Sequence, residues 1–221
     1  MSDTNIIPSY KEGLKDLIEQ LGGMLPEDKL AVFNHDAAQL AQIHTSPLRV
    51  KKGGKAPLFS LPNATGKTID LSELLQKGAV VLTFYRGTWC PYCNLELSIY
   101  QKILPQIKQA GASLVAVSPM NPDNSFQMMD TNKFQFEVLS DVGNKVASQY
   151  TTVFKNPETS IQAMADSGYD FHGFYDDKSA ELPVPATFVI SKDGTLLFAS
   201  SAGGDYRERV EPGEILEALA K

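Results

Sequence analysis

Cysteine and histidine are scarce in this sequence, with two cysteines and three histidines among 221 residues. None of the imidazoles, His35, His44 and His172, stands at zinc-finger spacing from a cysteine, so no metal is predicted. No apolar run approaches the ~20 residues of a membrane span, and the first eight residues lack signal-peptide features. The net charge is −6 with both signs spread along the chain, which disfavours nucleic acid as a partner. We therefore expect a cytoplasmic protein with no membrane contact.

One stretch, residues 79–93, holds both cysteines and organises the rest of the chain. An apolar run from Ala79 to Tyr85 predicts a buried strand. Residues 86–88 break that pattern, and Cys-Pro-Tyr-Cys at 90–93 begins a long helical stretch. The strand therefore delivers both thiols to the start of a helix. In the cytoplasm such a pair is more often catalytic or redox-sensing than a structural disulfide.

The placement of the cysteines favours redox chemistry. With Cys90 near the N-cap, Pro91 falls at the first helical position, where its missing N–H costs nothing. Residues three apart share one helical face, close enough for Cys90 and Cys93 to form a disulfide with little movement. The positive end of the helix dipole favours a thiolate, so we expect Cys90 to attack and Cys93 to resolve the mixed disulfide. Half of a zinc site and two inert thiols remain as alternatives.

The motif and its setting also carry a family resemblance. Cys90–Cys93 resembles the active-site motif of glutaredoxins, and Phe84–Cys93 is similar to the peroxiredoxin-like branch of the AhpC/TSA family. Further matches are Ala56–Leu61, Phe136–Asp141 and Pro185–Ile190. The resemblance covers about residues 54–221. It implies an α/β thioredoxin-like fold, with a central mixed sheet flanked by helices, and thiol redox chemistry without a bound cofactor.

We expect the chain to be divided into two parts, a redoxin domain and an N-terminal extension. Residues 54–221 would form the redoxin domain, and residues 1–53 an N-terminal helical extension with a linker. Within the extension, residues 9–44 show two helical apolar stripes: Ser9 and Glu12 form a capping-box pattern, and Gly22-Gly23 ends the first helix. The apolar faces must pack against something. Packing on the redoxin domain and a homodimer contact both stay open.

The residues that follow the cysteines predict a βαβ unit. Apolar residues recur at helical spacing from Leu95 to Ile107, Pro105 predicts a kink, and Ser113–Ser118 forms the next strand. Such a unit has parallel strands and a right-handed crossover. Ligands of these sheets bind beyond the carboxyl ends of the strands, where Cys90 is placed. Weaker signals predict a helix capped by Asp123, a strand at 136–139, a hairpin at 187–199 and a last helix at 213–220.

Two later segments are harder to interpret. Residues 155–182 look irregular and aromatic-rich, which is typical either of an insertion over a sheet edge or of a functional lid. His172, within this segment, could assist proton transfer only if it lay near the sulfurs. Residues 205–209 are charged, and we expect them to be solvated rather than catalytic.

The resemblance also implies supporting residues. Trp89, Pro91 and Tyr92 belong to the motif. Pro185 matches the proline that is cis in thioredoxin-fold proteins, and a cis bond there would expose the Val184 backbone to an incoming disulfide.

The sequence departs from the peroxiredoxin motif. That motif places proline seven residues, and threonine or serine three residues, before the peroxide-attacking cysteine. Relative to Cys90 these positions are Thr83 and Gly87, and the second peroxidatic arginine aligns with Pro185. Arg86 and Thr88 are candidates to replace the missing donors, because a nearby cation lowers a thiol pKa and holds an anionic oxygen. The alternative for Arg86 is a surface ion pair.

Three functions follow as hypotheses. In the first, Cys90 attacks a hydroperoxide or a disulfide, Cys93 closes the internal bridge, and thioredoxin or glutathione reduces it. Family resemblance favours a thiol-dependent peroxidase, whereas the missing motif favours a glutaredoxin-like or thioredoxin-like disulfide reductase. The second is a redox-responsive binding module whose N-terminal helices engage a partner. The third is a small zinc-binding module.

Overall fold

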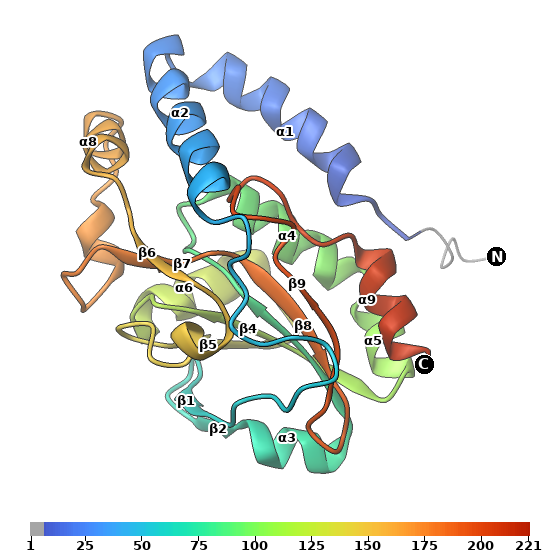
Figure 1. The fold of residues 1–221 in the computed structure, drawn as a ribbon. Helices are drawn as coiled ribbons and strands as arrows, with labels where there is room; N and C mark the ends of the chain where they lie inside the picture. The colour runs from blue at the N-terminus through green and yellow to red at the C-terminus, as the bar shows by residue number, and fades with distance from the viewer. Residues whose placement is uncertain (1–6) are drawn as a thin grey trace.

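A five-stranded mixed sheet forms the centre of the computed structural model, which describes residues 7–221 (Figure 1). The strand order is β5-β4-β3-β8-β9. Strands β5, β4 and β3 are parallel to one another, whereas β8 runs antiparallel to β3 and β9 antiparallel to β8. The strands are β3 (Ala79–Phe84), β4 (Ala112–Ser118), β5 (Glu137–Ser140), β8 (Ala186–Ile190) and β9 (Leu196–Ser200). This is the mixed α/β sheet that the sequence predicts.

The central βαβ unit is confirmed. Strand β3 leads into α4 (Pro91–Lys102) and α5 (Leu104–Gln109), and β4 returns parallel to β3 with Val81 opposite Leu114. The helix breaks at Ile103, two residues before Pro105. A proline within a helix removes one backbone hydrogen bond and clashes with the preceding turn. The expected kink is therefore a full break between two helices.

The two faces of the sheet bury different residues of β3. Val81 joins the larger core under α4, α5 and α9 (Pro212–Leu219), together with both cysteines. Val80, Leu82 and Phe84 point to the opposite core. That core lies under α3 (Leu71–Lys77), α7 (Ala147–Tyr150) and the small sheet of β1 (Ser60–Pro62) and β2 (Thr68–Asp70). Successive side chains of β3 thus point alternately into the core that contains the thiols and into the core on the opposite face of the sheet.

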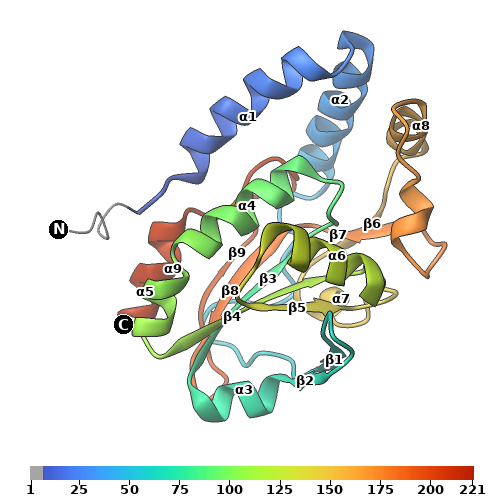
Figure 2. The same ribbon diagram turned by 180° about the vertical axis from the view of Figure 1, so that it is seen from behind.

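The N-terminal helices form a hairpin on the thiol side. Helix α1 (Tyr10–Met24) lies along α4, and α2 (Glu27–Ile43) packs beside α8 (Glu158–Asp166), as Figures 1 and 2 show from opposite sides. Ser9 caps α1 by accepting the Glu12 N–H, and Tyr10 and Leu14 are buried against the redoxin core. Packing on the host domain is therefore observed, while the division of the chain at residue 53 stays a prediction. Helix α1 does not end at Gly22-Gly23 as expected but continues to Met24, one residue beyond them.

The expectation of an irregular segment at 155–182 is wrong. Strand β6 (Val153–Lys155) pairs with β7 (Glu181–Pro183), α8 lies between them in sequence, and η1 (Phe171–Phe174) is a 3₁₀ turn. Two three-residue strands are too short to show an alternating pattern, so only their long-range pairing reveals them. Another correction concerns α6 (Pro122–Asn132), which is capped by Asn121 rather than Asp123. Among the described residues, no helix is both long and apolar enough to cross a membrane.

Candidate active site around Cys90 and Cys93

The two cysteines share the first turn of α4. Cys90 is the N-cap, Pro91 occupies the first helical position, and the N–H of Cys93 donates to the Cys90 carbonyl at 3.1 Å. Both residues are free, buried thiols. Local sequence explains this geometry, because a proline after the N-cap fixes where the helix begins. The structure thus brings the two predicted sulfurs together.

Cys90 is as buried as Cys93, although it lies at the end of the helix and is the cysteine expected to attack. Cys90 is 1% exposed and Cys93 is fully buried. Both belong to a core cluster that includes Tyr10 of α1, Tyr92 of the motif and Tyr206 of the loop before α9. The N-terminal hairpin and this loop therefore cover the sulfurs. Sequence periodicity could predict the apolar helix faces but not which surface they cover.

The electrostatic environment shifts the pKa values of the two thiols in opposite directions. Burial raises the pKa of Cys90, but the Cys93 hydrogen bond and the charges of Arg86 and Arg209 outweigh it and lower the pKa to about 6. Burial raises the pKa of Cys93 well above its usual value, and the hydrogen bond and charge of Cys90 raise it further. Near neutral pH Cys90 is therefore the thiolate and Cys93 the thiol. This asymmetry fits an attacking Cys90 and a resolving Cys93.

Arg86 is a buried neighbour of the thiolate, not a surface ion-pair residue. Its side chain is 3% exposed, and its guanidinium carbon lies 3.9 Å from the centre of the Tyr206 ring and 4.6 Å from that of Trp89. Its Nη2 donates to Asn156 Oδ1 at 3.0 Å. Aromatic contacts stabilise a desolvated guanidinium. Thr88 differs, because it is half-buried and only its backbone forms hydrogen bonds in the described part of the chain.

The aromatic segment after α8 packs directly onto this loop. Trp89 Nε1 donates to Tyr175 Oη at 2.7 Å, and Tyr175 Oη donates to the Arg86 carbonyl at 2.9 Å. A Cβ on Gly87 would lie only 2.7 Å from Trp89 Nε1 and 2.9 Å from Tyr175 Oη. The position at which the peroxiredoxin motif carries threonine or serine therefore has no room for a side chain. His172 is exposed on η1 and packs against Phe171.

Glu96 and Arg209 form a buried ion pair that sequence reasoning missed. Arg209 Nε donates to Glu96 Oε2 at 2.8 Å, and Arg209 Nη2 donates to Cys93 Sγ at 3.2 Å. Burial raises the pKa of Glu96 to about 7, although Arg209 opposes the rise. Glu96 also accepts from Thr83 Oγ1 at 3.3 Å. The expectation of a solvated segment at 205–209 is therefore wrong for Arg209. Glu96 could have been found by its position three residues after Cys93, whereas Arg209 has no local signal.

Val184 and Pro185 do not take the expected form. No described residue has a cis peptide bond, so the bond before Pro185 is trans. Val184 is fully buried, its N–H donates to the Thr152 carbonyl at 2.8 Å, and its carbonyl accepts from Thr151 Oγ1 at 3.0 Å. Both backbone groups are thus used within the fold. The Val184 backbone is not presented to an incoming disulfide, because it is bonded to the residues next to β6.

A groove of about 490 Å³ opens beside the motif. It lies between the N-terminal hairpin and the loop before α9, with Leu14, Leu21, Leu30, Tyr92 and Arg207 among its lining residues. The described residues contain no cluster of three or more His, Cys, Asp or Glu side chains arranged as metal ligands.

Comparisons with known proteins agree with this fold and place the chain in a family. Thiol-disulfide oxidoreductase ResA of Bacillus thuringiensis is 30% identical over 164 residues, which cover 74% of this chain and 76% of that protein. Chloroplastic peroxiredoxin Q of Populus jackii is 31% identical over 102 residues, covering 46% and 47%. The crystal structure of peroxidoxin BcpB from Mycobacterium tuberculosis superposes with a TM-score of 0.61 at 24% identity, covering 77% of this chain and 97% of that one. The AhpC/TSA family model matches residues 52–199. The chain belongs to the AhpC/TSA family.

Proposed function

We propose that this oxidoreductase is a thiol-dependent peroxidase in which Cys90 reduces a hydroperoxide and Cys93 resolves the product. The observation that carries the proposal is a buried thiolate next to a buried cation, Cys90 beside Arg86, at the carboxyl edge of the sheet of an AhpC/TSA family member. A low thiol pKa supplies the nucleophile at neutral pH. A desolvated guanidinium can stabilise the oxygen anion that leaves.

The reaction balances with the residues present and an external dithiol or two thiols. The Cys90 thiolate attacks one peroxide oxygen, the O–O bond breaks, and the alkoxide or hydroxide leaves and takes up a proton. Cys90 is then a sulfenic acid. The Cys93 sulfur attacks it, water leaves, and a disulfide forms. An external thiol donor returns two electrons and restores both thiols.

Arg209 suits the resolving step. Its Nη2 touches Cys93 Sγ, so it stabilises negative charge as the Cys93 thiol loses its proton. Glu96, with a pKa raised to about 7 mainly by burial, is bound to the same guanidinium and can take up a proton near neutral pH. The ion pair therefore positions both charges next to the Cys93 sulfur, which reacts in the second step.

Two observations favour a hydroperoxide over a protein disulfide as the oxidant. Cys90 is 1% exposed, so a small molecule reaches it with less opening of the structure than a protein would need. The Val184 backbone, which would bind an extended disulfide substrate, is bonded within the fold. The second candidate is a thiol-disulfide oxidoreductase without peroxidase activity. The similarity to ResA favours it.

The proposed partners follow from the chemistry. Thioredoxin or glutathione would supply the electrons, in the cytoplasm. A homodimer through the N-terminal hairpin is proposed as well, because Ile18 and Met24 are exposed apolar side chains on α1. Sedimentation velocity of the wild type and of Met24→Glu tests it: a dimer that Met24→Glu dissociates supports the contact, and a monomeric wild type rejects it.

A coupled assay tests the function. Hydrogen peroxide, an organic hydroperoxide and a protein disulfide are offered separately, with thioredoxin or glutathione as donor. We expect turnover with a hydroperoxide, none with Cys90→Ser, and a trapped sulfenic acid or mixed disulfide with Cys93→Ser. Turnover with the protein disulfide alone would favour the second candidate. A protein that turns over none of them would be a redox-responsive binding module instead.

A further inference from the structure

Two buried hydrogen-bond donors, one of them on Arg86, have no partner among residues 7–221. They are Arg86 Nε and Asn156 Nδ2, on side chains that are 3% and 2% exposed. The two residues are joined by the hydrogen bond from Arg86 Nη2 to Asn156 Oδ1 at 3.0 Å. Buried donors are nearly always paired in native proteins, so two unpaired ones on directly bonded residues need an explanation. The two donors therefore call for an acceptor that the described residues do not supply.

The surroundings of this pair restrict what can fill it. The rings of Tyr206 and Trp89 lie against the guanidinium, so a ligand has to approach Arg86 in the plane of its N–H groups. Asn156 follows β6, and its backbone N–H donates to the Ala180 carbonyl at 2.8 Å. This hydrogen bond fixes the backbone of Asn156 at the end of β6.

Arg86 also packs against the residue next to the reacting cysteine, because its guanidinium carbon lies 4.6 Å from the centre of the Trp89 ring. The positive charge of Arg86 is one of the influences that lower the pKa of Cys90. A ligand held by these donors therefore sits in the field of both the cation and the thiolate. The residues supply donors and positive charge, and the complementary ligand is an oxygen acceptor that becomes negative during reaction. An alkoxide or hydroxide leaving a peroxide is such a group.

We propose that Asn156 is a substrate-binding residue of the peroxidase, and that its Nδ2 acts with Arg86 Nε to bind the hydroperoxide and its leaving oxygen. This inference rests on the proposed function and names the residue that completes its oxyanion site. As the Cys90 sulfur bonds to one peroxide oxygen, the O–O bond breaks and its electron pair passes to the other oxygen. The two N–H groups hold that oxygen until it takes a proton from water. Asn156 thus replaces the hydroxyl donor that the peroxiredoxin motif carries where this chain has Gly87.

Two substitutions of Asn156 test the inference in the full-length protein. Asn156→Ala removes both the donor and the support of Arg86. Asn156→Asp keeps the shape and the acceptor for Arg86 Nη2 but removes the N–H donor and adds negative charge. The rate of Cys90 oxidation by hydrogen peroxide and by tert-butyl hydroperoxide is measured by rapid quenching and mass spectrometry. We expect both variants to lose on the order of 100-fold, as when one oxyanion donor is removed.

A second reaction separates substrate binding from a structural role. Alkylation of the Cys90 thiolate by iodoacetamide forms no oxyanion, so its rate, corrected for the thiolate fraction at each pH, should change less than about threefold. The matched control is Asn144→Gly. Asn144 is also a buried asparagine, its Nδ2 donates to the Glu181 carbonyl on β7, and its φ of 55° suits glycine. This variant should keep the wild-type peroxide rate.

The outcomes are distinguishable. Loss of the peroxide rate with a preserved corrected alkylation rate supports the inference. Equal losses in both reactions, or a wild-type peroxide rate in Asn156→Ala, would overturn it while leaving the peroxidase intact. Should Asn156→Ala fail to fold, a wild-type peroxide rate in Asn156→Asp would overturn it as well. A wild type that reacts with neither hydroperoxide would overturn the proposed function itself, and the inference with it.

Discussion

Two arginines from distant parts of the chain stabilise the charge of one sulfur. Arg86 precedes Cys90 by four residues, and Arg209 comes from the loop before α9, yet both lower the pKa of Cys90, to about 6 against the opposing effect of burial. Only the thiolate is nucleophilic. We therefore expect the alkylation rate of Cys90 to rise about tenfold per pH unit below pH 6 and to level off above it.

A pH–rate profile with iodoacetamide checks this value, with Cys90→Ser as the control that assigns the signal. Replacing Arg86 by Gln removes a favourable charge, so the midpoint should move to higher pH. The profile of Lys133→Gln should match that of the wild type, because Lys133 is an exposed residue paired with Asp130. A wild-type midpoint near the ordinary thiol pKa of about 8.5 would contradict the assignment.

The buried pair of Glu96 and Arg209 makes a prediction about stability. Both side chains are 1% exposed. Removing one partner leaves a buried uncompensated charge, which typically costs about 3–5 kcal/mol, whereas replacing both by apolar groups is often nearly neutral. We expect Arg209→Met to lower the free energy of unfolding by that amount and Glu96→Leu/Arg209→Met to recover most of it. Urea unfolding of the reduced proteins measures both.

An exposed pair provides the comparison. Lys55 and Asp193 are 3.0 Å apart with side chains 67% and 68% exposed, and Lys55→Met should leave the urea midpoint nearly unchanged. If the double variant at Glu96 and Arg209 is no more stable than Arg209→Met, the two charges do not form a coupled pair.

At the scale of residues, the sequence predicts what is close along the chain. Cys90 and Cys93 are found by their spacing, and Arg86 by its nearness to them. Arg209 lies 116 residues from the sulfur that it touches, and Asn156 lies 70 residues from Arg86. No local pattern marks such contacts, because they depend on how β6 and the loop before α9 are placed. The sequence therefore predicts the residues at the centre of the candidate site but not those at its edge.

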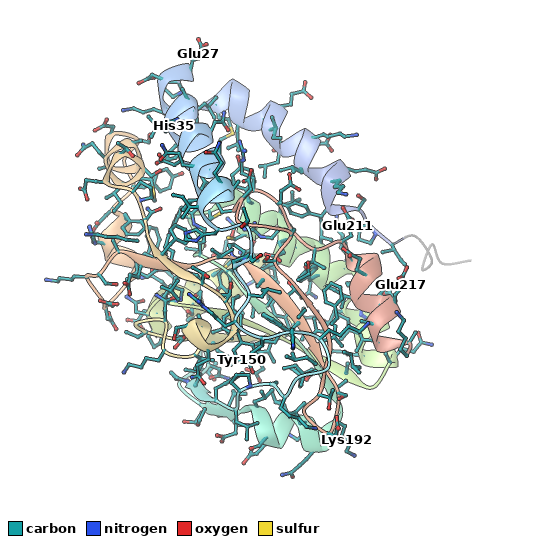
Figure 3. The ribbon with its side chains drawn as sticks, in the orientation of Figure 1. Glu27, His35, Tyr150, Lys192, Glu211 and Glu217 are labelled. Carbon is teal, nitrogen blue, oxygen red and sulfur yellow. The ribbon has the colours of Figure 1, made fainter. Side chains whose placement is uncertain are left out.

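At the scale of elements, the start of α1 is capped from the far end of the chain. The Glu211 carboxylate accepts from the N–H groups of Tyr10 and Lys11 at 3.0 and 2.9 Å, and Figure 3 shows Glu211 where α1 begins next to α9. A negative charge there also suits the helix dipole. We expect Glu211→Ala to cost about 1–2 kcal/mol and to speed amide exchange in α1.

Hydrogen exchange with mass spectrometry over residues 10–24 checks this prediction. The control is Glu214→Ala, because within residues 7–221 the Glu214 carboxylate accepts from the Glu211 N–H alone, at 3.2 Å, and so caps α9 rather than α1. Exchange in α1 should stay at the wild-type rate in the control. Equal acceleration in both variants would show that α1 is loosened by α9 rather than by loss of its own cap.

Long elements with a regular apolar period are predicted correctly from the sequence, and very short ones are not. The strand at 79–85, the broken helix after it and the returning strand carry strong apolar periods, and each is found where expected. Strands β6 and β7 have three residues each, and their pairing joins residues about thirty apart, which no local signal encodes. The isomer of the bond before Pro185, which is trans, is likewise not encoded by the proline alone.

At the scale of the whole molecule, the thiols are enclosed by segments from both ends of the chain. Tyr10 of α1 and Tyr206 of the loop before α9 share a core with Cys90, and Tyr206 Oη donates to the Phe33 carbonyl of α2 at 2.7 Å. Access to Cys90 therefore requires local opening, and larger reagents require more of it. We expect iodoacetamide to react much faster than a bulky aromatic disulfide, once each rate is divided by that reagent's rate with a free thiol of matched pKa.

The variant Glu211→Ala tests whether α1 is the part that opens. Loosening α1 should raise the corrected rate of the bulky reagent several-fold and change the rate of iodoacetamide little, because the small reagent needs only side-chain motion. Stopped-flow measurements of both reagents on the wild type, Glu211→Ala and Glu214→Ala separate these effects. If Glu211→Ala speeds both reagents equally, α1 does not select by size, and the cover over Cys90 has to open elsewhere, at Tyr206 or at the aromatic turn that holds Trp89.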